Sequence, residues 1–150
     1  MSPFWRSRAR LVARPATILA FDYGRKRIGV AVGQTVTATA TPLTSVLARE
    51  SLPRWELISE LVRAWEPDFL VVGLPLNMDG TEQTSTRDVQ WFKGELEKRF
   101  ALPVFTADER LSTREARERL AAWGARGTDD DQVAAQVILE TWFSDRRDVF

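Results

Sequence analysis

The sequence lacks two residue types on which much protein chemistry depends. It has no cysteine, which excludes disulfides, thiolate nucleophiles and metal sites built on cysteine. It has no histidine, which excludes imidazole bases, histidine metal ligands and Ser–His–Asp triads. A metal site in this chain would therefore have to be built from oxygen ligands.

An excess of charge and a long apolar run are also missing. Lys plus Arg is 21 and Asp plus Glu is 21, so the formal net charge is zero. Any contact with a polyanion must then rest on local basic patches. No window approaches the ~20 apolar residues of a membrane span, and the N-terminus has no signal-peptide pattern. We expect a cytoplasmic protein with no membrane segment.

The length and composition favour one globular domain. The chain has 150 residues, of which 44% are hydrophobic and 28% charged. Residues 1–15 are rich in arginine and contain no acid, which predicts a basic N-terminal extension before a domain over 16–150.

Apolar patterning predicts the order of the elements. Apolar runs and period-two alternation predict strands at 17–22, 27–33, 36–40, 69–73 and 103–106. Helical spacing predicts helices at 51–66, 89–100, 112–123 and 133–142, with Ser51 as an N-cap and Pro53 in the first turn. This order predicts an α/β domain whose mixed sheet has an antiparallel edge and a parallel centre.

Acidic residues follow or precede these elements at positions that could converge. Asp22 ends the first strand, Asp108 and Glu109 follow the last, and Asp131 opens the final helix. Ligands of open α/β sheets gather at the carboxyl ends of the strands. Carboxylates without histidine suit Mg²⁺ or Mn²⁺, and paired cations ~3.5–4 Å apart can promote phosphodiester cleavage.

Structural roles are the alternative for each acid taken singly. Asp22 could cap a turn, Glu109 could pair with Arg110, and the run Asp129–Asp131 could cap a helix.

Basic and aromatic residues are candidates for substrate contacts. Arg25, Lys26 and Arg27 follow Asp22 directly and could bind phosphates, although a solvated turn would have the same pattern. We expect Asn77, in the loop 73–80, Arg110 and Arg114 near the same edge. No aromatic spacing marks base stacking, so we expect core or surface packing for the six tryptophans, Trp5, Trp55, Trp65, Trp91, Trp123 and Trp142.

Four stretches in order resemble the motifs of one family. They are Phe21–Val32, Val72–Thr81, Asp108–Thr113 and Asp131–Leu139. They resemble the YqgF family, whose members are described as pre-16S rRNA nucleases and as Holliday-junction-resolvase-like proteins. Where that family often has Ser-Asp after the second strand, this chain has Gly33-Gln34, which leaves no acid there.

The resemblance implies a fold and a metal-dependent nuclease site. The implied fold is RNase H-like, a five-stranded mixed sheet flanked by helices. The implied catalytic and metal-binding residues are Asp22, Glu109 and Asp131, where Asp131 is chosen from its run because Ala134-Ala135 follow at the family spacing. The implied role is maturation of precursor 16S rRNA in ribosome biogenesis, with RNA as partner and a monomer or homodimer as the assembly.

Three other functions stay open from the sequence. The same fold could resolve branched DNA, because carboxylate and metal chemistry does not distinguish the sugar. The chain could also be a non-catalytic nucleic-acid-binding factor of ribosome assembly. An actin-like or sugar-kinase-like phosphotransferase is disfavoured, because such enzymes need two domains to enclose ATP and this chain supplies one.

Overall fold

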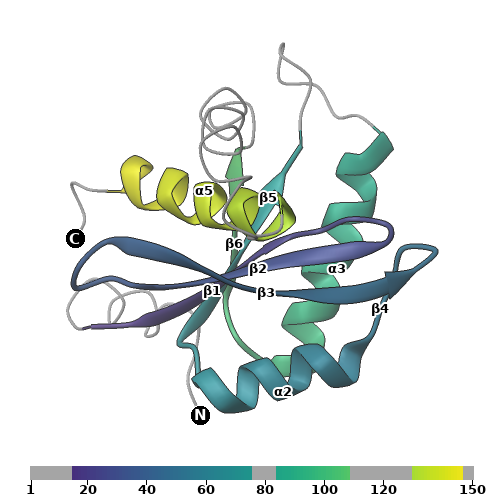
Figure 1. Ribbon diagram of the computed structural model, residues 1–150, viewed down its shortest axis with the longest axis horizontal. Helices are drawn as coiled ribbons and strands as arrows, with labels where there is room; N and C mark the ends of the chain where they lie inside the picture. The colour runs from purple at the N-terminus through teal and green to yellow at the C-terminus, as the bar shows by residue number, and fades with distance from the viewer. Residues whose placement is uncertain (1–14, 76–83, 109–129, 147–150) are drawn as a thin grey trace.

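The centre of the molecule is one mixed sheet. A computed structural model describes residues 15–75, 84–108 and 130–146. The strand order is β4-β3-β2-β1-β5-β6 (Figure 1). The strands are β1 (Thr17–Asp22), β2 (Arg27–Gln34), β3 (Thr39–Arg49), β4 (Leu52–Pro53), β5 (Phe69–Leu74) and β6 (Val104–Asp108). Strands β1 to β4 pair antiparallel, whereas β1, β5 and β6 pair parallel, which confirms the predicted mixed sheet. The two-residue β4 was not predicted.

Helices cover both faces of the sheet, as Figure 1 shows. Helices α2 (Trp55–Trp65) and α3 (Thr84–Phe100) pack on one face through Ile58, Phe92 and Leu96. Helix α5 (Asp130–Asp145) packs on the other. Its buried apolar residues there are Ile138, Leu139, Trp142 and Phe143. The central strands are continuous apolar runs because helices bury them on both sides.

Alternation along each strand assigns side chains to these two faces. In β1, Leu19 and Phe21 belong to the α2/α3 core, whereas Ile18 and Ala20 belong to the α5 core. Asp22 continues the second series, so its side chain is on the α5 face.

Several predicted element boundaries are wrong. Helices α3 and α5 begin at Thr84 and Asp130, before the predicted positions 89 and 133. Two further errors have one common origin. Helix α2 begins at Trp55, not at Ser51, because the preceding residues form a hairpin between β3 and β4. Glu50 and Ser51 turn that hairpin with positive φ angles of 51° and 71°. The third strand begins at Thr39 and continues through Pro42, which a bulge beside Val30/Ala31 accommodates. In both places the pairing of β3 with its neighbouring strands determines the boundary, and the local sequence pattern does not.

Some expectations concern residues outside the described part. The predicted helix at 112–123 lies there, as does nearly all of the predicted extension over 1–15. In the described ranges, none of the helices combines the length and apolar character that crossing a membrane requires.

Candidate active site

Three residues lie side by side across the antiparallel strands. Asp22 of β1 is opposite Gly29 of β2, and Gly29 is opposite Ser45 of β3. Directly opposed residues of antiparallel strands have Cα atoms about 4.5–5.5 Å apart. The row therefore brings Asp22 and Ser45 to the two sides of one glycine, at the end of the sheet where β1 finishes.

The first turn of helix α5 contacts Gly29, the middle residue of this row. A Cβ atom built on Gly29 would lie 1.8 Å from the carbonyl oxygen of Asp131 and 2.9 Å from the backbone nitrogen of Gln132. No side chain fits in that space, so the first turn of α5 contacts the strand backbone itself. The lack of a side chain at Gly29 therefore brings Asp131 to the same end of the sheet as Asp22.

Hydrogen bonds fix one oxygen of the Asp131 carboxylate. The Ser45 hydroxyl donates to Oδ2 of Asp131 at 2.7 Å, and Nε2 of Gln132 donates to the Ser45 oxygen at 3.3 Å. The other oxygen, Oδ1, is buried and has no hydrogen-bond partner in the part of the chain that the structure describes. A buried polar oxygen without a partner costs about 1–3 kcal/mol, and more when it is charged.

This donor set fits a divalent cation. Carboxylate oxygens are the ligands that Mg²⁺ and Mn²⁺ prefer, and a bound cation would compensate the orphaned Oδ1. Asp131 of α5 supplies such an oxygen, and Asp22 is the last residue of β1, on the same face of the sheet.

The third predicted acid, Glu109, lies outside the described residues. Accordingly, the described ranges contain no group of three potential metal ligands. Asp108, the last residue of β6, has Ala107 of the α5 core as its neighbour and Val104 of the α2/α3 core four positions earlier. Alternation therefore directs Asp108 away from the face of Asp22.

The basic turn, defined here as Arg25, Lys26 and Arg27, leads into β2 after Asp22, Tyr23 and Gly24. All three of its side chains are exposed. The turn is held against the β3–β4 hairpin, because the carbonyl of Arg25 accepts from the Ser51 N–H at 3.0 Å. The carbonyl of Lys26 accepts from the Ala48 N–H at 2.8 Å. The three cations thus project from a fixed backbone beside the acids.

Three further sequence candidates are not described by the structure, and two residues of the site were not predicted. Asn77, Arg110 and Arg114 lie outside the described residues. Ser45 and Gly29 were not singled out for this site, because nothing in their local sequence announces a partner in α5. Only the strand register brings them to Asp131.

Sequence comparison finds one matching family and many similar proteins. Residues 16–145 match the profile of a family described as "RuvX: Holliday junction resolvase". A protein of Nitrosococcus oceani named "Putative pre-16S rRNA nuclease" is 48% identical over 140 residues, which cover 91% of this chain and 92% of that protein. A protein of the same name from Pectobacterium carotovorum is 50% identical over 131 residues, covering 85% and 94% respectively.

Solved structures share the fold at low sequence identity. Thermus thermophilus RuvC in complex with a Holliday junction substrate has a TM-score of 0.57 at 17% identity, covering 89% of this chain and 97% of that one. The fowlpox virus resolvase in complex with Holliday junction DNA has a TM-score of 0.54 at 10% identity, covering 86% and 97%. The fold is therefore RNase H-like, of the RuvC type, as predicted. The match over residues 16–145 and the relatives of 48–50% identity show that the chain belongs to the RuvX family, also known as YqgF.

Proposed function

We propose that the chain is a metal-dependent endonuclease that hydrolyses phosphodiester bonds of structured RNA, with precursor 16S rRNA as substrate. Relatives that are 46–50% identical carry the name "Putative pre-16S rRNA nuclease", which supports the substrate class. The observation that carries the chemistry is the buried, unpartnered Oδ1 of Asp131 on the same side of the sheet as Asp22.

Asp22, Asp131 and Glu109 are the proposed ligands of Mg²⁺ or Mn²⁺. In β6, Phe105 and Ala107 pack in the α5 core, on the face that carries Asp22. Side chains alternate along a strand, and Glu109 is the next position of this series in the sequence. A divalent cation bound there would supply the positive charge that offsets the charge of the phosphodiester in the transition state.

The chain's own groups prepare this site. The Ser45 hydroxyl holds Oδ2 of Asp131, so that Oδ1 is the oxygen presented. The contact between Gly29 and α5 fixes how close Asp131 comes to the sheet. In the proposed complex the basic turn binds phosphates flanking the scissile bond, which fixes the register of the strand without reading its sequence.

The test is neutralisation of each carboxylate without change of shape. Asp22→Asn and Asp131→Asn should abolish Mn²⁺-dependent cleavage of a precursor 16S rRNA fragment, as followed by gel electrophoresis. Asp145→Asn is the matched control, because Asp145 is exposed at the other end of the same helix. It should cleave like the wild type. A folded Asp131→Asn variant that cleaves at the wild-type rate would contradict the proposal.

Thermal unfolding gives a second readout that does not depend on cleavage. Mn²⁺ should raise the Tm of the wild type and of Asp145→Asn, because a ligand that binds only the native state stabilises it. It should leave the Tm of Asp131→Asn unchanged.

Branched DNA is the second candidate substrate, favoured by the description of the matching family as Holliday junction resolvases. Cleavage of a four-way DNA junction should be assayed beside the rRNA fragment, at equal concentrations of substrate and Mn²⁺. Preference for the junction would replace the RNA proposal. Binding of RNA without divalent-dependent cleavage of either substrate would indicate a non-catalytic assembly factor instead.

A further inference from the structure

An exposed tryptophan packs on a partly buried aromatic cluster where α2, α3 and the β1–β2 connection meet. The ring of Tyr23 stacks on that of Phe92, with centroids 4.6 Å apart and planes at 22°. The ring of Trp91 lies 6.5 Å from those of Tyr23 and Trp55. Phe92 is fully buried, whereas 43% of Trp91 is exposed. Trp91 therefore presents an aromatic surface to solvent from a well-packed base.

Two hydrogen bonds at Ser51 connect this aromatic cluster to the basic turn. The Tyr23 hydroxyl donates to the carbonyl of Ser51, and the N–H of Ser51 donates to the carbonyl of Arg25 at 3.0 Å. Ser51 thus holds both the aromatic ring and the start of the basic turn. The aromatic platform, defined here as Trp91 with its neighbours Tyr23, Phe92 and Trp55, and the backbone of the basic turn therefore belong to one hydrogen-bonded unit. Little backbone entropy remains to be lost when a ligand binds.

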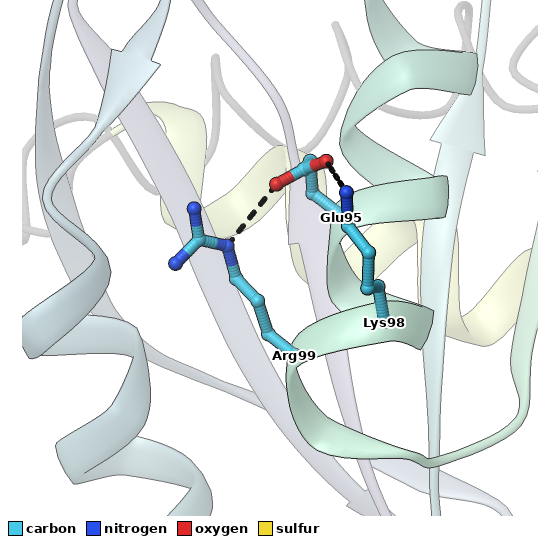
Figure 2. A network of polar contacts seen from close by, with 3 residues as sticks. All are labelled: Glu95, Lys98 and Arg99. Carbon is cyan, nitrogen blue, oxygen red and sulfur yellow. Dashed lines mark hydrogen bonds and ion pairs between the residues drawn. The ribbon is translucent and has the colours of Figure 1, made fainter.

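Two cationic side chains of α3, Lys98 and Arg99, already make contacts within the protein. The Arg99 guanidinium lies 4.1 Å from the centroid of the Trp55 ring. Figure 2 shows Glu95 between Lys98 and Arg99, accepting at 2.9 Å and 3.2 Å respectively. These groups form a network within α3 that packs on the back of the cluster. The basic turn is therefore the better candidate for binding phosphate beside Trp91.

A neutral, planar ligand suits the exposed ring better than an anion does. Asp88 is exposed one turn before Trp91 on α3, and its carboxylate is close enough to raise the pKa of Tyr23, an effect second to that of burial. Arg87 is exposed on the same turn, so the two formal charges beside Trp91 offset each other and a phosphate gains no net attraction there. A nucleobase carries no charge and has a π-face that stacks on indole.

The basic turn links the platform to the candidate active site, although the two lie on opposite faces of the sheet. Asp22 and Tyr23 are consecutive, and the Asp22 side chain is on the α5 face while Tyr23 packs in the α2/α3 core. We propose that Trp91, supported by Tyr23, stacks an unpaired base of the nucleic acid strand whose phosphates bind the basic turn. The proposed function supplies only the position of the scissile phosphate, at Asp22 and Asp131. The stacking itself does not depend on cleavage.

Binding without divalent cations tests this directly. Fluorescence anisotropy in EDTA would compare a short single-stranded RNA with a strand of the same length whose central residues are abasic. Trp91→Ala should weaken binding of the intact strand by about 5- to 150-fold, the range that one stacked base contributes. It should leave binding of the abasic strand and the salt dependence unchanged. Trp91→Phe, which keeps an aromatic ring, should lose less affinity.

Trp65→Ala is the matched control. Trp65 is 39% exposed at the last residue of α2, about 15 Å along that helix from Trp55 and near the start of β5. It should bind both strands like the wild type. The proposal is overturned if Trp91→Ala binds the intact strand as the wild type does, or if it weakens both strands equally. Cleavage by the wild type in Mn²⁺, measured separately, decides the proposed function and leaves this result unaffected.

Discussion

The hydroxyl of Ser45 donates a hydrogen bond of 2.7 Å to Oδ2 of Asp131, across 86 positions of sequence. It joins β3 to the first turn of α5 and determines which carboxylate oxygen remains for a ligand. Oδ2 is engaged, and Oδ1 is the buried oxygen that has no partner among the described residues. Ser45 is thus a positioning residue, which acts through Asp131.

Removing this hydroxyl should weaken divalent cation binding. Ser45→Ala is expected to lower the affinity for Mn²⁺ by about 10- to 100-fold, the usual effect of losing a hydrogen bond that orients a metal ligand. Isothermal titration calorimetry would measure it, and Ser45→Thr, which keeps a hydroxyl, should recover most of the affinity. Equal Mn²⁺ affinity in Ser45→Ala and the wild type would show that Ser45 does not position Asp131.

The basic turn should contribute charge without base specificity. Lys26→Ala is expected to weaken binding of intact and abasic strands to the same extent, and to lower the slope of log K against log salt by about 0.7 to 1. Arg63→Ala is the control, because Arg63 is exposed in the last turn of α2, near the start of β5. A salt dependence unchanged in Lys26→Ala would mean that Lys26 binds no phosphate.

Tyr23 should make the stability of the protein fall at alkaline pH. Burial raises its pKa above the ordinary value of 10.0, and the Asp88 carboxylate raises it further. Because the folded state favours the protonated phenol, its contribution to stability is fully present below pH 10. It is lost as the pH rises through the higher pKa of the folded state.

A tyrosine titration can be assigned to this residue, because Tyr23 is the only tyrosine of the chain. The near-ultraviolet absorbance of tyrosinate should titrate above pH 10 in the native protein and near 10 in urea. Tyr23→Phe should remove the contribution of the phenol to the alkaline loss of stability. It should also cost about 1 kcal/mol at neutral pH through the lost hydrogen bond to Ser51. A native titration at or below the unfolded value would contradict the assignment.

The sequence predicted the parts of the fold that depend on local patterns. The central strands β1 and β5 are continuous apolar runs. Asp22 ends β1 and Asp131 lies in the first turn of α5, and the sequence pattern indicates both elements. The hairpin at Glu50 and Ser51 was missed, because Ser51 has the side chain of an N-cap yet adopts a φ of 71°. Its conformation depends on pairing between β3 and β4 and on the hydrogen bond from Tyr23.

Residues whose roles depend on distant partners could not be found in the sequence. Ser45 has no local feature that distinguishes it from the threonines around it, and its contact with Asp131 exists only once β2 and β3 pair in register. Trp91 stands beside the apolar stripe of Val89, Phe92 and Leu96 in the sequence, and core or surface packing was expected for it. Its exposure on an aromatic base requires Tyr23 and Trp55, which come from two other elements.

Two glycine-to-alanine substitutions should shift stability in opposite directions. Gly29→Ala places a methyl group 1.8 Å from the Asp131 carbonyl oxygen, so α5 must move away from β2. We expect a loss of about 1–3 kcal/mol in the free energy of unfolding, as for other overpacked sites, together with loss of Mn²⁺ binding. Gly94 of α3 has no described atom within 4 Å of the point where an alanine methyl group would lie, so Gly94→Ala should gain about 0.5–1 kcal/mol from helix propensity and leave Mn²⁺ binding intact. Urea unfolding of both variants provides the comparison. If Gly29→Ala were as stable as the wild type and bound Mn²⁺ equally well, the close contact between α5 and β2 would not be what positions Asp131.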